Sequence, residues 1–287
     1  MKILYVTDLH GNINHYEQVL ELAKRKDIDI CINGADVLPK GGDLHSTQRI
    51  FIKEYLIKYA KKWKKEVNKP YYFTTGNDDL EFLDYNLFFT CKFHKDFRFM
   101  QNFCSYEIKS KNVVIVNYNN VKDYPFGLKN RCRLDNKNDD IDLIQYGPVY
   151  ATSDGFENIM DWRAEAIKKP TIEEELKTIT YDINLYKKRG YIVIFNCHVP
   201  PIGCGLDILL NGQPVGSDAV TNFILNVQPH LSLHGHIHES PMVTNKYYNY
   251  IDTTLCVQPG QEINKLHYAV IDIDENNCSI KGIKING

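Results

Sequence analysis

The chain has 287 residues, of which 43% are hydrophobic and 24% charged, and this composition excludes collagen-like, low-complexity and disordered proteins. Lys and Arg total 34 against 36 Asp and Glu, so the formal net charge of −2 is not that of a general nucleic-acid-binding protein. No apolar run approaches the roughly 20 residues that span a bilayer. A chain of this length forms a core without a disulfide or a metal to hold it together.

The cysteines and the first residues bear on the cellular compartment. Eight cysteines are scattered along the chain without a C-x-x-C pair. The apolar start, Met1–Val6, is followed too soon by polar residues to be the apolar region of an export signal. We therefore expect buried, reduced thiols and a cytoplasmic location, with no membrane span.

Strands and helices alternate in the first 75 residues. Short runs rich in Ile, Tyr and Val predict buried strands, and apolar residues at helical spacing predict the helices between them. This alternation is typical of an α/β fold with mainly parallel strands. The predicted elements are a strand at Lys2–Thr7, a helix from its N-cap Asn12 to Lys26, a strand at Ile28–Asn33, a helix capped by Ser46 or Thr47 and running to about Asn68, and a strand at Pro70–Thr74.

The alternation loosens after about residue 80. Aromatic residues are frequent between Phe82 and Phe103, where we expect them to pack, with a base-stacking platform as the alternative. Cys104–Ile108 and Val113–Tyr118 predict a strand pair, and Asn119–Tyr150 is irregular and charged. This last segment carries Lys129, Arg131 and Arg133, which we expect in a solvent-exposed loop, with a cap that binds additional phosphate as the alternative.

Regular elements return in the last part of the chain. We find no internal repeat and no linker, so we expect a single domain over residues 1–287, with an inserted cap-like or irregular region at about 84–156. The predicted elements are helices at Phe156–Lys168 and Thr171–Lys188, a strand at Tyr191–Asn196, a helix at Ser217–Asn226, a strand at Leu231–His234, and from Tyr247 several short strands with turns at Pro259-Gly260 and Asp274–Asn277.

Polar side chains follow five of the predicted strands, at the point where each strand ends. Because ligands of open α/β sheets bind at the carboxyl ends of the strands, we expect these clusters to form one site. The clusters are Asp8-Leu9-His10-Gly11, Gly34-Ala35-Asp36, Gly76-Asn77-Asp78-Asp79, Asn196-Cys197-His198 and Gly235-His236-Ile237-His238.

The side chains of these clusters are a mixed set of oxygen and nitrogen donors. In an extended chain, alternate residues share a face, so Asp8 with His10, and His236 with His238, are each expected to point at a common ion. The set has too many histidines for a calcium cage and lacks the thiolates of structural zinc sites. Seven donors are too many for one tetrahedral ion, but they suit two ions that share a bridging carboxylate. The seven are Asp8, His10, Asp36, Asn77, His198, His236 and His238.

The order of the clusters resembles that of the calcineurin-like metallophosphoesterase superfamily, which is D-x-H, G-D, G-N-H-[D/E], a lone H, and G-H-x-H. The resemblance covers about Met1–Leu80 and Tyr191–Lys284. D-x-H alone is weak evidence, but five blocks in order, each ending a predicted strand, are specific. The resemblance implies a four-layer α-β-β-α sandwich, in which two mixed sheets are flanked by helices.

The resemblance also implies how the donors are shared between two divalent transition-metal ions. Asp8, His10, Asp36 and His238 would surround one ion. Asp36, Asn77, His198 and His236 would hold the other, with Asp36 as the bridge. Mn²⁺ is the ion we favour, and Fe, Zn²⁺ and Ni²⁺ are the other metals that such enzymes use.

Two residues depart from the family pattern. Ala35 stands where a glycine usually precedes the bridging Asp, a small change unless the backbone φ is positive there. Asp78 stands in place of the histidine of G-N-H-[D/E], which in the family assists the leaving oxygen or binds the phosphate. Beside two cations the Asp78 carboxyl is expected to have a lowered pKa and to be unable to donate a proton. His45 and His94 are candidate substitutes.

These observations predict a metal-dependent phosphoesterase in which water activated by two metals attacks phosphorus. Asp36, Asn77, Asp78 and His198 are the candidate catalytic residues. The missing histidine favours a phosphodiesterase acting on a small-molecule or nucleotide phosphoester. A phosphomonoesterase or nucleotide pyrophosphatase, and a non-catalytic binding scaffold of the same fold, are the alternatives.

Two further polar residues close to the clusters are not expected to be ligands. Asp79 is interpreted as the N-cap or dipole partner of the following helix. His234 shares a face with His236 by alternation, but the family pattern leaves it out, so we expect a buried histidine that supports the ligands. The substrate and the oligomeric state are not predicted.

Overall fold

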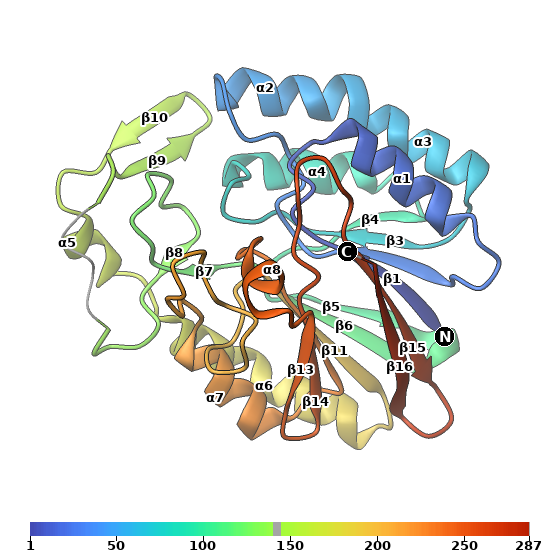
Figure 1. The fold of residues 1–287 in the computed structure, drawn as a ribbon. Coiled ribbons are helices and arrows are strands. Elements are labelled where there is room, and N and C mark those ends of the chain that lie inside the picture. Colours follow the sequence, from blue (N-terminus) through green and yellow to red (C-terminus); the bar gives the residue numbers. More distant parts are fainter. Residues whose placement is uncertain (140–144, 287) are drawn as a thin grey trace.

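Two six-stranded mixed sheets lie face to face, and helices cover the outer side of each (Figure 1). The computed structural model describes residues 1–139 and 145–286. The four layers confirm the predicted α-β-β-α sandwich. Residues 140–144, which belong to the segment predicted to be irregular, lie outside the described residues.

The first sheet contains the strands of the N-terminal alternation and the last two strands of the chain. Its order is β16-β15-β1-β2-β3-β4, in which β1 to β4 are parallel and β15 runs antiparallel to β1. Helices α1 to α4 cover its outer face (Figure 1). The strands are β1 Lys2–Val6, β2 Ile30–Asn33, β3 Tyr71–Phe73, β4 Phe97–Phe99, β15 Tyr268–Asp274 and β16 Ser279–Asn286, and the helices are α1 Ile13–Ala23, α2 Leu44–Phe51, α3 Ile57–Glu66 and α4 Asp84–Cys91.

The second sheet has the order β13-β14-β12-β11-β6-β5. Its central strands β6, β11, β12 and β14 are parallel, and α6 and α7 cover its outer face. The predicted strand pair of the middle region is its β5–β6 edge. The elements are β5 Ser105–Ile108, β6 Val113–Tyr118, β11 Ile192–Cys197, β12 Leu231–Leu233, β13 Tyr248–Ile251, β14 Thr254–Val257, α6 Ile172–Lys188 and α7 Asp218–Val227.

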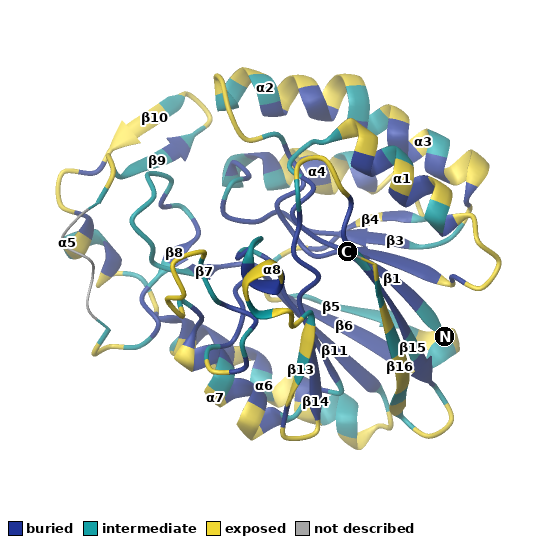
Figure 2. Cartoon of the chain, in the orientation of Figure 1, coloured by how far each residue is buried: buried dark blue, intermediate teal, exposed yellow. Residues whose placement is uncertain are grey.

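Alternation along the strands separates three hydrophobic layers. In β1, Ile3 and Tyr5 point into the layer between the two sheets, whereas Leu4 and Val6 pack against the helices. All four side chains are fully buried, and Figure 2 shows the buried strands in the middle of the molecule. Strands buried on both faces are typical of sheets covered by helices, and they hold the carboxyl ends of β1, β2 and β3 rigidly in place.

Local capping explains where the helices begin. Asn12 is the N-cap of α1, as predicted, and its side chain accepts a hydrogen bond from the His15 backbone. Thr171 and Glu174 form a capping box at α6. The prediction that Ser46 or Thr47 caps the second helix was wrong: the helix begins at Leu44, because Asp43 takes the N-cap position. A π-helical segment, Ile52–Leu56, joins α2 to α3.

The helix predicted at Phe156–Lys168 was also wrong in its first half. Gly155–Asn158 is a strand, β10, which pairs with β9 (Val149–Thr152). Gly155 has φ 151°, a backbone conformation that ends a tight turn and favours a hairpin over a helix. The helix α5 is limited to Trp162–Ala166. The remaining short elements are β7 Val121–Lys122, β8 Cys132–Arg133, α8 Ser240–Thr244, and the 3₁₀ turns Glu81–Leu83 and Lys109–Lys111.

The aromatic residues between Phe82 and Phe103 are only partly packed. Phe97 and Phe99 are buried in β4, as expected. The prediction that this group packs was wrong for five residues, which are 37–82% exposed: Tyr85, Phe88, Phe89, Phe93 and Phe103. The first three lie on α4 and Phe93 lies on the turn after it.

The cysteines and the helices complete the description. In residues 1–139 and 145–286, no helix combines the length and the apolar character needed to cross a membrane. All eight cysteines are free; six are buried, and Cys104 and Cys278 are half-buried.

Candidate metal centre

Loops that follow strands of both sheets bring the seven predicted donors together. Asp8, His10, Asp36 and Asn77 follow β1, β2 and β3 of the first sheet, and His198, His236 and His238 follow β11 and β12 of the second. Within each sheet these strands are parallel, so their carboxyl ends meet at one edge. The centre therefore lies where the two sheets face each other, and each sheet supplies about half of it.

One group of donors comprises Asp8, His10, Asp36 and His238, whose ligand atoms lie within 4.8 Å of one another. His238 Nε2 is 3.1 Å from His10 Nε2 and 3.2 Å from Asp8 Oδ1. His10 Nε2 is 4.0 Å from Asp36 Oδ2.

The second group comprises Asp36, His198 and His236. His198 Nε2 lies 3.3 Å from Asp36 Oδ2 and 3.1 Å from Asn77 Oδ1, so the amide oxygen of Asn77 belongs to this group as well. Asp36 is the residue that the two groups share. The donor atoms thus gather on two sides of Asp36, with Asn77 beside the second group.

The backbone that presents these side chains is not extended. Asp8, His10 and His236 have φ values of 56°, 42° and 69°, and Asp36 has φ 49°. The explanation of the i, i+2 pairs by alternation in an extended chain was therefore wrong. Left-handed residues bend each loop sharply just after its strand, and such strained backbone is concentrated at functional sites. Ala35 is not among the residues with positive φ, so it replaces glycine there without strain.

Two glycines allow the donors to approach the backbone closely. A Cβ atom on Gly76 would overlap the carboxylate of Asp36, and one on Gly235 would overlap that of Asp8. Arg131 Nε donates to the Gly76 carbonyl at 3.0 Å and fixes the loop from the other side. These positions require glycine because they face a carboxylate.

The acidic residues and the histidines of the centre shift one another's pKa values. Burial raises the pKa of Asp8 and Asp36, but the adjacent histidines outweigh it and hold both pKa values well below the usual range. Burial lowers the pKa of His236 to about 3 and that of His10 to about 4. Burial alone lowers the pKa of His198 too, but the carboxylates of Asp36 and Asp8 raise it to about 9.

The separations between donor atoms fit metal ions. Ligands about 2.1 Å from one ion stand about 3.0–3.4 Å apart in tetrahedral or octahedral geometry. The distances of 3.1, 3.2 and 3.3 Å within the two groups lie in this range. Two ring nitrogens that face each other at 3.1 Å, as in His10 and His238, are also an ordinary arrangement around a shared cation. The donor set therefore fits two ions.

Asp78 lies at the open side of the centre, next to a lysine that the sequence analysis did not single out. Its Oδ2 is 3.7 Å from Lys40 Nζ and 3.9 Å from His10 Nδ1. In the protein alone, burial and the charge of Asp36 raise the pKa of Asp78 to about 6, opposite to the shift expected beside two cations. The Pro39-Lys40-Gly41-Gly42 run after the Asp36 cluster could have indicated a loop at the site.

The side chains of Asp79 and His234 both contact backbone groups of the loops that carry the candidate donors. The prediction that Asp79 caps the next helix was wrong: its carboxylate accepts hydrogen bonds from the backbone of Gly76, Val37 and Leu38. It thereby joins the loops that carry Asp36 and Asn77. His234 is buried, as predicted, with Nδ1 2.9 Å from the Cys197 carbonyl, and it supports the loop that leads to His198.

The basic residues of the middle region do not lie in a solvent-exposed loop, so this expectation was wrong. Lys129 is fully buried, with Nζ 2.8 Å from Asp123. Arg131 is 2% exposed and contacts Asp84 at 2.5 Å. Arg133 Nε donates to Glu175 at 2.8 Å. Each cation has a carboxylate partner, so these residues hold the middle region in place.

The same region forms a wall beside the second donor group. The ring of Tyr124 packs on His236 with a centroid distance of 4.8 Å, and that of Phe126 is 6.2 Å away. These aromatic contacts restrict the orientation of the His236 ring. Sequence reasoning missed both residues, because nothing in the pattern of the irregular segment relates them to a histidine about 110 positions later.

His45 and His94, the two candidates to replace the missing histidine, lie in different places. His45 stacks on Phe82, with ring centroids 5.0 Å apart, at the start of α2. His94 precedes β4, so it lies at the amino end of a strand that is parallel to β3. The candidate donors follow the carboxyl ends, and His94 is therefore on the opposite edge of the sheet.

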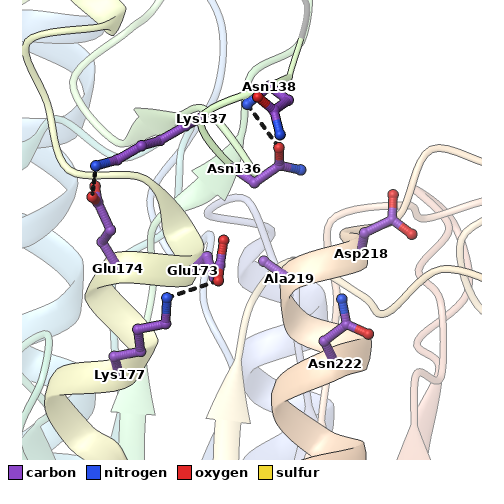
Figure 3. A pocket seen from close by; sticks show the side chains of 9 residues that line it. All are labelled: Asn136, Lys137, Asn138, Glu173, Glu174, Lys177, Asp218, Ala219 and Asn222. Atoms are coloured by element: carbon purple, nitrogen blue, oxygen red, sulfur yellow. Dashed lines mark hydrogen bonds and ion pairs between the residues drawn. The ribbon is translucent and has the colours of Figure 1, made fainter.

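A separate surface cavity of about 420 Å³ lies between the first turns of α6 and α7 (Figure 3). Lys177 pairs with Glu173 at 2.7 Å and Lys137 with Glu174 at 2.8 Å, so both lysines of its lining are neutralised. None of the seven candidate donors lines it. The lining residues are Asn136, Lys137, Asn138, Glu173, Glu174, Lys177, Asp218, Ala219 and Asn222.

Comparison with solved structures shows the same fold in distant proteins. TT1561 of Thermus thermophilus is 16% identical with a TM-score of 0.59, and the match covers 100% of this chain and 98% of that one. GAP50, the anchor in the inner membrane complex of Plasmodium, is 10% identical with a TM-score of 0.51, and the match covers 99% and 87% of the two chains. No curated protein matches the sequence significantly.

A four-layer sandwich with histidines and carboxylates at the carboxyl ends of both sheets defines a metal-binding α/β protein. A family model described as calcineurin-like phosphoesterase matches residues 1–240. The chain therefore belongs to the calcineurin-like phosphoesterase family. This membership supports phosphoester hydrolysis that depends on two metal ions.

Proposed function

We propose that this protein is a two-metal phosphoesterase that hydrolyses phosphodiesters of small molecules or nucleotides. The observation that carries the proposal is the convergence of seven oxygen and nitrogen donors into two groups joined by Asp36. A scaffold that only binds a partner has no need to keep all seven.

The residues around each ion are assigned from these groups. Asp8, His10, Asp36 and His238 hold one ion, and Asp36, Asn77, His198 and His236 hold the other, with Mn²⁺ as the first choice and Fe, Zn²⁺ or Ni²⁺ as the others. When bound, the two ions polarise the phosphoryl group and make water nucleophilic. Asn77 contributes a neutral oxygen, which avoids the repulsion that a third carboxylate would exert on an anionic substrate.

The choice of phosphodiester follows from Asp78. The ammonium group of Lys40, 3.7 Å away, favours the ionised form of the Asp78 carboxyl, and cations bound at the centre favour it further. Asp78 is then a poor proton donor for a leaving alcohol, and leaving groups that depart without protonation are favoured. We infer that the Asp78 carboxylate influences the charge and the hydrogen bonding on the side of the centre where the substrate binds. Asp36, Asn77 and His198 orient the reacting phosphate.

Contacts of the middle region and the free cysteines support two further parts of the proposal, the domain organisation and the cellular compartment. We treat residues 1–287 as one domain in which the region at about 84–156 is an insertion, since its Tyr124 and Arg131 contact the loops of the centre. The eight free cysteines support a reducing compartment such as the cytoplasm.

Metal analysis and a pair of model substrates test the proposal. We expect about two equivalents of transition metal per chain and, with Mn²⁺ added, faster hydrolysis of bis-p-nitrophenyl phosphate than of p-nitrophenyl phosphate. A strong preference for the monoester would show that the activity is that of a phosphomonoesterase and not of a phosphodiesterase. A metal-free protein without activity on a broad phosphoester panel, including nucleotide pyrophosphates, would favour the binding scaffold.

A further inference from the structure

Four exposed aromatic side chains gather on α4 and the turn after it, and none of them belongs to the candidate metal centre. Tyr85, Phe88 and Phe89 lie on the helix, and Phe93 lies on the turn. They are 37–82% exposed, whereas Leu87 on the inner side of the helix is fully buried. We call these four residues the aromatic patch. Apolar groups that gather on a surface in this way are typical of interaction sites.

Three cationic side chains lie next to the aromatic patch without an acidic partner. Lys92 and Lys95 are exposed, and Lys92 Nζ is 6.0 Å from the centre of the Phe89 ring. Arg98 donates to the Lys95 carbonyl at 2.9 Å and to the Tyr72 hydroxyl at 3.3 Å. Within residues 1–139 and 145–286, none of the three cations forms an ion pair. This part of the surface is therefore positive, although the formal net charge of the chain is −2.

Helix α3 extends the positive surface on the other side of the turn. Lys64 bonds to the carboxylate of Asp96, so the acidic group of the turn is already neutralised. Lys61 precedes Lys64 and Lys65 by three and four positions, and this spacing places the three side chains on one side of the helix. Lys61 and Lys65 are exposed and have no ion pair in the described part of the chain.

Two open surface cavities border the same turn, and His94 and Lys95 line both of them. The cavity of about 270 Å³ lies against Ala60 and Trp63 of α3. The cavity of about 370 Å³ lies between α4 and β5 and combines an apolar floor with a cationic rim. Its lining includes Phe88, Phe99, Tyr106, Lys92, Lys95 and Arg98.

We propose that this face, formed by the aromatic patch with Lys92, Lys95 and Arg98, docks on the surface of a bilayer that contains anionic lipid. The rings enter the interfacial region, where aromatic side chains are favoured. The long cationic side chains stay at the level of the lipid phosphates. Charge complementarity is the argument for this occupant, because the three cations lack partners in the protein and an anionic bilayer supplies them.

The geometry of the rings argues against a nucleic acid as the occupant. Sequence-independent binding of single strands uses ring faces on which successive bases stack. The Phe88 and Phe89 rings are perpendicular, the Tyr85 and Phe89 rings are tilted by 48°, and the ammonium group of Lys92 lies over the Phe89 ring. A second copy of the chain is disfavoured too, because a symmetric dimer through this face would bring the same cations together.

The docking face leaves the candidate metal centre uncovered. The turn that carries Phe93 precedes β4, so it lies at the edge of the first sheet opposite to the candidate donors. Membrane docking through this turn would therefore place the protein at a bilayer without closing the site. The inference goes beyond the proposed function and does not depend on hydrolysis, so the two proposals can fail separately.

The experiment measures sedimentation of the full chain with vesicles of phosphatidylcholine alone and with vesicles that contain about 30% phosphatidylglycerol, at low and high salt. The variants are Phe93→Ser, Phe93→Trp and the double substitution Lys92→Glu/Lys95→Glu. Tyr181→Ser, at a residue of α6 that is 73% exposed, is the control for the ring. Metal content and circular dichroism check that each variant folds.

A second control has the same change in net charge as Lys92→Glu/Lys95→Glu. Lys188 and Arg189 lie at the end of α6, are exposed, and form no ion pair within residues 1–139 and 145–286. Lys188→Glu/Arg189→Glu therefore separates a local effect of the docking face from a general effect of charge.

We expect the wild type to bind the anionic vesicles at least about ten-fold more tightly than the neutral ones and to be released by high salt. Lys92→Glu/Lys95→Glu weakens binding at least about 30-fold, since each lysine near an anionic surface contributes about five-fold. Phe93→Ser weakens it roughly ten-fold, and Phe93→Trp retains it. Both control variants stay within about two-fold of wild type.

The inference is overturned if the wild type binds neither kind of vesicle, if it binds both equally, or if the variants of the docking face bind as the controls do. Binding of a single-stranded oligonucleotide, or formation of a dimer, that depends on Phe93 and Lys92 in a protein without vesicle binding would also overturn it. Either result would assign this face to a different occupant.

Discussion

Asp36 Oδ2 and His198 Nε2 lie 3.3 Å apart, although 162 positions separate the two residues in the chain. Asp36 follows a strand of the first sheet, and His198 follows a strand of the second. Their contact exists only when the two sheets pack face to face. The candidate metal centre is therefore a property of the sheet–sheet junction, and neither half of the chain contains it alone.

Substitution of the shared carboxylate tests the arrangement of the donors. Because Asp36 belongs to both groups, Asp36→Asn is expected to lower the metal content from about two equivalents to one or fewer and to reduce phosphoester hydrolysis at least about 100-fold. Elemental analysis and bis-p-nitrophenyl phosphate hydrolysis measure these effects. Asp182→Asn, an exposed position of α6, serves as the control. Full metal content in Asp36→Asn would contradict the bridging role.

A methyl group added beside Asp36 tests the close approach of the backbone. Gly76→Ala places a Cβ atom against the Asp36 carboxylate and is expected to weaken metal affinity roughly 10- to 100-fold. Gly282→Ala adds the same atom where nothing lies within 4 Å and is expected to bind metal as wild type does. Titration of Mn²⁺ by calorimetry compares them. Equal affinities in the two variants would show that the loop adapts without cost.

The buried guanidinium of Arg131 is predicted to stabilise the fold. Arg131→Met removes the charged donor that the guanidinium supplies to the Asp84 carboxylate and to the Gly76 carbonyl, so the free energy of unfolding should fall by about 2–4 kcal/mol. Urea denaturation measures the change. Arg163→Met, at an exposed position of α5, is expected to stay within about 0.5 kcal/mol of wild type. A similarly small effect at Arg131 would show that this ion pair contributes little.

Lys169 is predicted to make stability depend on pH. Burial and the nearby Arg133 lower the pKa of Lys169 to about 8 in the folded protein, below the value of 10.5 expected for the unfolded chain. Between these values the unfolded state binds more protons, so the free energy of unfolding rises with pH from about 8 to about 10.5. The penalty for the charged amine is fully present below about pH 8.

In the wild type, Lys169 is expected to raise the free energy of unfolding by about 1–2 kcal/mol between about pH 8 and 10. Lys169→Met is expected to remove this part of the rise. Urea denaturation at several pH values provides the comparison. The adjacent Lys168 is exposed, and Lys168→Met is expected to keep the slope of wild type. Identical slopes in both variants would contradict the burial of the Lys169 amine.

Local patterns in the sequence were sufficient for much of the fold. Alternating runs such as Lys2–Val6 and the capped helix after Asn12 were recognised because burial and capping depend on neighbours a few residues away. The hairpin β9–β10 was missed because Gly155, one residue with an unusual φ, outweighed the helical spacing that follows it. The start of α2 was misplaced because Asp43, and not Ser46 or Thr47, takes the N-cap position.

The sequence by itself determined which seven side chains are candidate ligands, because each cluster directly follows a strand and the five clusters keep a specific order. Only the tertiary structure decided the distances between their donor atoms, that Asp8, His10 and His236 are presented by left-handed backbone, and that Lys40 faces Asp78. It also decided that Lys129 and Arg131 are buried. Their carboxylate partners and the close approach of Lys40 depend on how loops from separate strands pack, and no short-range pattern of residues encodes that packing.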